Sequence, residues 1–124
     1  MDSNTELNSI EQKVLEFFLA KRRGSTPESG IGLNGIIVSS RDYSGVGFMT
    51  ELDRSETLRV GSQTESYTWG DIGGKLNSSL ESGYLVFVEK GHVSAIEGFV
   101  YGEAEWPQKI EEIEIYPYDG TTYT

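Results

Sequence analysis

The sequence contains no cysteine, a single histidine and only three prolines among its 124 residues. Without cysteine, the chain can form no disulfide framework, thiolate nucleophile or cysteine-ligated zinc site. Basic residues are also scarce: ten Lys and Arg stand against twenty Asp and Glu, which leaves a formal net charge of −10. Because an acidic surface repels nucleic acid and anionic lipid, we expect neither to be a partner. The same surface suits a basic protein partner, or serves only solubility.

Long apolar runs are absent as well. No stretch approaches the roughly 20 apolar residues of a membrane-spanning helix. The start MDSNTELNSI has neither the basic start nor the apolar run of a signal peptide. These features predict a cytoplasmic protein. The length predicts one domain over residues 1–124, large enough to bury a core without metals or disulfides, with residues 1–8 and 119–124 frayed.

The first element predicted is a helix over residues 9–22. Ser9 is a suitable N-cap, Gln12 completes a capping-box pattern three residues later, and Gly24 is a natural stop. The apolar face of this helix, which we expect to be buried, comprises Ile10, Val14, Phe17 and Phe18.

Most of the remaining chain reads as strands. The strongest signal is a hairpin of residues 84–90 and 92–101 that turns at Lys90-Gly91. Further strands are predicted at residues 36–41, 46–52, 56–60 and 110–116, with a turn at 42–45, a polar linker at 25–30 and a short helix within 71–82. The fold class is therefore α+β, with one long N-terminal helix packed on a mostly antiparallel sheet of about five or six strands.

Few residues are candidates for catalysis. His92 follows the turn glycine, where a histidine is usually exposed, and we predict no catalytic residue, metal or cofactor. Glu97 lies in an otherwise apolar strand and allows two interpretations. It is either an acid/base or cation anchor in a pocket lined by Tyr101 and Trp106, or part of a bulge with Gly98 that turns the carboxylate outward or pairs it with an arginine. The bulge is the favoured interpretation.

Acidic residues are concentrated near the C-terminus. Residues 97–124 hold seven acids and one base, a net charge of −6, interleaved with aromatic residues. Carboxylates around aromatic anchors are one way to bind a basic protein; a solvated outer sheet face is the alternative. The predicted partner-binding residues are Glu97, Tyr101, Glu103, Glu105, Trp106, Glu111, Glu112, Glu114 and Tyr116.

The C-terminal third carries a resemblance. It rests on three runs: Gly83-Tyr84-Leu85-Val86, residues 97–102 and Trp106-Pro107. Together they resemble the closing hairpin of small acidic bacterial proteins of unknown function. Some of those proteins are similar to immunity proteins that neutralise a toxin. The resemblance implies a cytosolic protein that binds another protein and has no catalytic residues.

Three hypotheses follow from these patterns. The first is a non-enzymatic acidic inhibitor or immunity-type protein that covers a basic site on a toxin or nuclease. The second is a small-molecule-binding or catalytic domain with a pocket around Glu97, Tyr101 and Trp106. The third is a subunit of a larger assembly, in which the helix face completes a partner's core.

Overall fold

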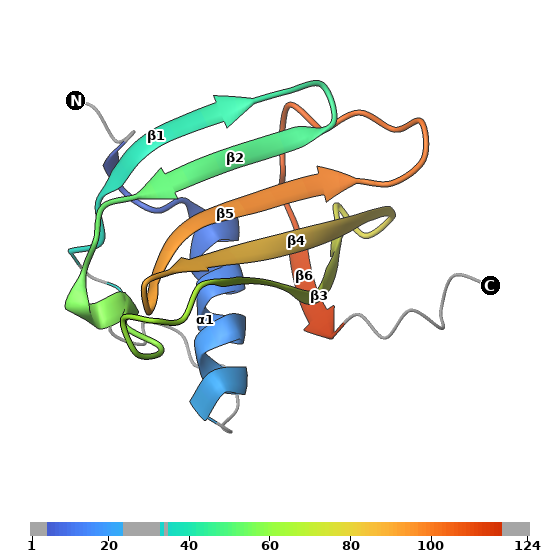
Figure 1. The fold of residues 1–124 in the computed structure, drawn as a ribbon. Coiled ribbons are helices and arrows are strands. Elements are labelled where there is room, and N and C mark those ends of the chain that lie inside the picture. Colours follow the sequence, from blue (N-terminus) through green and yellow to red (C-terminus); the bar gives the residue numbers. More distant parts are fainter. Residues whose placement is uncertain (1–4, 24–32, 34, 118–124) are drawn as a thin grey trace.

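The fold is known from a computed structural model that describes residues 5–23, 33 and 35–117. It is α+β, with one helix packed on a six-stranded antiparallel sheet (Figure 1). The elements are α1 (Ser9–Arg23), β1 (Val38–Tyr43), β2 (Gly47–Leu52), the 3₁₀ helix η2 (Glu56–Leu58), β3 (Tyr67–Leu76), β4 (Leu80–Glu89), β5 (His92–Val100) and β6 (Ile113–Pro117). The strand order is β1-β2-β5-β4-β3-β6, so the predicted fold class is confirmed.

The predicted helix and its buried face are confirmed. The side chains of Ile10, Val14, Phe17 and Phe18 are all buried, and Phe18 is fully inaccessible. The helix lies against β4 and β6. The ring of Trp69 on β3 lies 5.3 Å from that of Phe18. The hydrophobic core is therefore the layer between α1 and one face of the sheet.

The predicted N-cap of this helix is wrong by one residue. The capping box is formed by Asn8 and Glu11: the Asn8 side-chain oxygen accepts from the Glu11 N–H, and the Glu11 carboxylate accepts from the Asn8 N–H. Ser9 is exposed. The amide of Asn8 and the longer side chain of Glu11 make the reciprocal pair that we assigned to Ser9 and Gln12.

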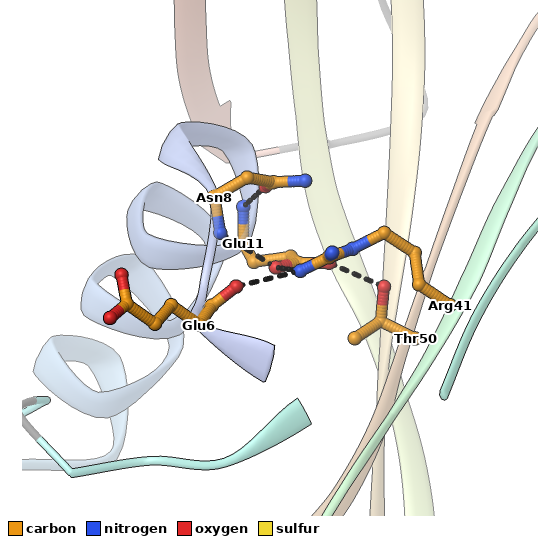
Figure 2. Close-up of polar contacts among 5 residues, drawn as sticks. All are labelled: Glu6, Asn8, Glu11, Arg41 and Thr50. Atoms are coloured by element: carbon orange, nitrogen blue, oxygen red, sulfur yellow. Dashed lines mark hydrogen bonds and ion pairs between the residues drawn. The ribbon is translucent and has the colours of Figure 1, made fainter. Parts of the chain in front are cut away.

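The Glu11 carboxylate also joins the helix to the sheet (Figure 2). Arg41 on β1 donates to its two oxygens from Nε and Nη2, at 2.7 and 2.6 Å, and Thr50 Oγ1 on β2 donates at 2.5 Å. Glu11 is completely buried, and the side chain of Arg41 is 12% exposed. Because each oxygen has more than one donor, the buried charge is fully hydrogen-bonded.

Several predicted boundaries in the first half of the sheet are wrong. β1 begins and ends two residues later than predicted, and the first hairpin turns at residues 44–46. The predicted strand 56–60 is instead the helix η2, which begins where the Ser55 side chain accepts from the Thr57 N–H. Only the single bridge between Arg59 and His92 remains of that strand. The hydrogen bond from the Thr57 N–H to the Ser55 side chain competes with strand pairing in this segment.

The predicted helix within residues 71–82 does not form. These residues belong to β3, a turn, and the start of β4. Ile72 and Leu76 are four apart, which places them on one face of a strand as well as of a helix, and Leu80 on β4 pairs with Leu76 across the turn. Gly74 allows β6 to pair closely with β3, because a Cβ there would lie 2.6 Å from the Glu114 carbonyl oxygen of the neighbouring strand.

The predicted hairpin at Lys90-Gly91 is confirmed; β4 begins four residues earlier than predicted, and β5 ends one residue earlier. β4 and β5 pair from Ser82↔Val100 to Glu89↔His92. Both turn residues have positive φ, 52° for Lys90 and 84° for Gly91, as in two-residue hairpin turns.

The last strand is shorter than predicted and pairs with β3 at the edge of the sheet. Several sequence expectations lie outside the described residues: the Gly24 stop, the linker 25–30, the tail 119–124 and residues 1–4 of the frayed start.

Tyr84 at the centre of the core gives a prediction at high pH. Its side chain is fully buried, with Oη 2.9 Å from Ser82 Oγ, and burial raises the pKa of the Tyr84 phenol to about 12. The unfolded phenol titrates near 10. This group therefore stabilises the fold fully below about pH 10, and the contribution is lost as the pH rises through 12.

We expect ultraviolet titration of the phenols to show one tyrosine that ionises about two pH units above an unperturbed phenol, or only on unfolding. In Tyr84→Phe this late step should be missing. Ionisation of all seven tyrosines near pH 10 with native circular dichroism would contradict the burial of Tyr84.

Candidate functional site

The sheet has one face covered by α1, and Figure 1 shows the helix behind the sheet in that view. Strand alternation identifies the other face. On β5, the side chains of Ile96 and Val100 are buried. Glu97 and Phe99, which lie between these two residues in the sequence, are half-buried and point to the opposite face. No helix within residues 35–117 covers that side. We call it the open face.

One row of the open face alternates acidic and apolar side chains across four strands. Asp42 on β1 pairs with Met49 on β2, Met49 with Glu97 on β5, and Glu97 with Leu85 on β4. Since adjacent strands are about 4.8 Å apart, the two acidic residues are roughly 10 Å apart with Met49 between them. A shallow hollow of about 250 Å³ lies at this place. Two carboxylates beside a thioether suit a cationic side chain with an apolar stem.

Aromatic and aliphatic side chains lie next to this row. Leu85, Phe87 and Phe99 on the open face are half-buried with no described helix over them. The ring of Phe99 meets that of Tyr101 edge to face, with centroids 5.5 Å apart. Both rings lie close over Gly83, where a Cβ would be 2.5 Å from Tyr101 Oη. Because Gly83 has no Cβ, the two rings can pack directly against the sheet at this position.

Charge on the open face is mostly negative. By register and strand alternation, its acidic residues on the strands are Asp42, Glu51, Glu81, Glu89, Glu97 and Glu114, with Lys75 as the base, so six acids and one base leave −5. Lys75 Nζ is 3.8 Å from a Glu81 oxygen, and the Tyr116 hydroxyl donates to the other Glu81 oxygen at 2.8 Å. The apolar centre is thus surrounded by carboxylates.

The structure divides the predicted partner-binding residues into three groups. Glu97, Tyr101, Glu114 and Tyr116 belong to the open face. Glu103, Glu105 and Trp106 lie in the segment after β5, and Glu111 and Glu112 lie just before β6. The backbone N–H groups of Glu111 and Glu112 both donate to the Asn77 side chain, and the Glu112 carboxylate accepts from Ser78. Glu111 and Glu112 therefore anchor the segment before β6 to the β3–β4 turn.

The predicted pocket around Glu97, Tyr101 and Trp106 does not assemble. Glu97 lies beside the hollow on the open face, whereas Trp106 packs against Phe48 with ring centroids 5.2 Å apart and lines a different cavity. The bulge at Glu97-Gly98 is also absent, because β5 stays in register with β2 and β4 through these residues. Glu97 faces outward by simple alternation.

The expectation that His92 is exposed is wrong. The residue is 4% exposed, with Nε2 3.0 Å from Glu56 Oε2 and Nδ1 3.3 Å from the Lys90 carbonyl oxygen. The hydrogen bond with His92 is the main cause that lowers the pKa of the Glu56 carboxyl. Both ring nitrogens are therefore used to attach η2 to the hairpin turn.

Sequence reasoning missed Asp42, Met49, Leu85 and Phe87 as members of the candidate site. Residues 84–88 are all apolar or aromatic, so composition alone does not separate the two faces of this strand. The alternation of Leu85 and Phe87 with Tyr84 and Val86 was the available signal, because a strand in a sheet covered on one side still places every second residue on the other.

No family model, curated protein or solved structure matches this chain. Within the described ranges, no group of three or more His, Asp or Glu side chains is arranged to hold a metal ion. None of the helices there combines the length and apolar character needed to cross a bilayer.

Proposed function

We propose that this protein is an acidic, non-enzymatic protein-binding domain of the immunity or inhibitor type, which covers a basic site on a toxin or nuclease in the cytoplasm. The open face carries the proposal. It combines half-buried apolar and aromatic side chains with a rim of carboxylates, which is the composition of an interface for a basic protein.

The row from Asp42 to Leu85 gives the interface its centre. An arginine or lysine of the partner would place its charged end between the carboxylates of Asp42 and Glu97 and its stem on Met49. Leu85, Phe87 and Phe99 would be covered and would supply the burial. The remaining acids, including Glu103, Glu105, Glu111 and Glu112, add to the field that attracts the partner.

Binding is preferred to catalysis because the one histidine has a structural use. Its two nitrogens are engaged by Glu56 and by the Lys90 carbonyl group. The acids of the open face lie around an apolar centre, an arrangement that suits recognition of a surface.

The test is affinity capture from the source cell, followed by association kinetics with the purified partner. We expect a basic protein to be captured by the wild type. Glu97→Lys should slow association about 3–10-fold at low salt and weaken its salt dependence, because the steering field falls. Phe87→Ala should instead speed dissociation.

The matched control is Asp53→Lys, which changes the net charge equally at an exposed residue of the loop after β2. We expect a much smaller effect on association from this variant. If Glu97→Lys and Asp53→Lys slow binding equally, or if the captured protein is acidic, the open face is not the interface.

A further inference from the structure

A second hollow lies on the other side of the sheet, beside Trp106. It has a volume of about 570 Å³, within the range of small-molecule sites. Three segments far apart in the sequence form it: the start of α1, the β1–β2 turn with Phe48, and the chain between β5 and β6. Figure 1 shows that last segment passing beside the β1–β2 turn before it descends into β6.

The wall of this cavity is fixed by backbone contacts. The Trp106 N–H donates to the Gly45 carbonyl oxygen at 2.9 Å, and the Val100 N–H donates to the Val46 carbonyl oxygen at 2.9 Å. The segment after β5 is therefore attached to the β1–β2 turn on both sides of its loop. A cavity bordered in this way is largely formed before any ligand arrives.

The cavity is mainly aromatic and aliphatic. Phe48 and Ile10 are buried at its base, and the rings of Phe48 and Trp106 meet at 72°. Tyr43 stands at the opening, 61% exposed, with its ring 6.3 Å from that of Phe48. Ile110 also lines the cavity. This surface offers two partly accessible ring faces and an apolar base.

The polar groups around the cavity are available to a ligand. The side chains of Ser44, Glu105 and Gln108 line it, and no hydrogen bond joins any of them to another described residue. Glu105 is exposed and is the only one of the described lining residues with a charged side chain. A carboxylate that lines the same cavity as the rings of Tyr43 and Trp106 favours an organic cation, because ring faces also attract positive charge.

We propose that this cavity binds a small organic amine with an aromatic or branched hydrocarbon body. The body lies against Phe48, Trp106 and Ile110, and the ammonium group pairs with Glu105. Ile10, Trp106 and Ile110 place this cavity on the helix side of the sheet, although Tyr43, Ser44 and Phe48 also line the hollow of the open face. The proposal does not depend on the proposed function, because it needs no protein partner.

The experiment uses 2-phenylethylamine as the probe and compares it with 2-phenylethanol and 3-phenylpropionate. Nuclear magnetic resonance follows the indole N–H of Trp106, with that of Trp69, packed against Phe17 and Phe18, as an internal reference. We expect the amine to shift the Trp106 signal saturably, with a Kd on the order of 1 mM. The alcohol and the carboxylate should bind about 3–10-fold more weakly, since an exposed ion pair contributes modestly.

Two matched variants isolate the charge. Glu105→Gln should abolish the preference for the amine over the alcohol and leave the affinity of the alcohol unchanged. Glu103→Gln removes an exposed carboxylate two residues away that does not line the cavity, and it should change nothing. The proposal is overturned if no probe shifts the Trp106 signal, if the carboxylate binds most tightly, or if Glu105→Gln keeps the amine preference.

Discussion

Replacement of Glu11 by alanine is expected to lower the free energy of unfolding by about 3–5 kcal/mol, the usual cost of removing one partner of a buried ion pair. The change removes the Glu11 carboxylate from the Arg41 guanidinium, which is 12% exposed, and leaves Thr50 Oγ1 without this acceptor (Figure 2). It also removes half of the capping box at Asn8. Urea unfolding followed by circular dichroism measures the loss.

The control for this prediction is Gln12→Ala, an exposed neighbour on the same helix, which should change stability by less than about 0.5 kcal/mol. The double variant Glu11→Ala with Arg41→Met should be less destabilised than the sum of its single changes, because both changes remove the same buried ion pair. Equal stability of Glu11→Ala and Gln12→Ala would show that the buried pair does not hold α1 to the sheet.

Replacement of Gly91 by valine should destabilise the protein by about 3 kcal/mol and lower Tm by about 10 °C. The turn holds Gly91 at a φ of 84°, which a β-branched residue strongly disfavours. A Cβ there would also lie 2.5 Å from the carbonyl oxygens of Gly61 and Ser62. These atoms belong to a loop that hydrogen-bonds to Gly91 through Val60 and Gly61, so the clash would displace the loop as well.

The matched control is Gly45→Val in the β1–β2 turn. A Cβ at Gly45 meets no atom within 4 Å, and its φ is not positive. We expect a shift in Tm of only a few degrees. If both valine variants melted at the same temperature, neither the positive φ nor the close loop would be important at Gly91.

The helix and the central hairpin were predictable because each carries a regular local pattern. Phe17 and Phe18 repeat with Ile10 and Val14 at helical spacing, and Lys90-Gly91 separates two long strand-forming runs. The segment after Asp71 was not predictable from periodicity alone. Apolar residues four apart fit both a helix and a strand. The close contact that this strand makes with β6, between Gly74 and Glu114, joins residues forty apart in the sequence.

The candidate site was only partly predictable for the same reason. The acidic character of the C-terminal region drew attention to Glu97, Glu114 and Tyr116, which do lie on the open face. Asp42 and Met49 reach the same row through the register of β2 against β5, a pairing between distant parts of the chain. Nothing local in a sequence specifies that register.

The order of the helix and strands along the chain also has a consequence for synthesis. α1 is made before every strand, whereas the surfaces it covers, on β4 and β6, are made only from residue 80 onward. At 5–20 residues per second, the ribosome reaches β6 roughly 5–20 s after α1 is complete. A helix of 15 residues is marginal alone in water, so through that interval Phe17 and Phe18 have no stable cover. The nascent chain therefore offers an apolar segment to chaperones during the whole time that its own sheet is being translated.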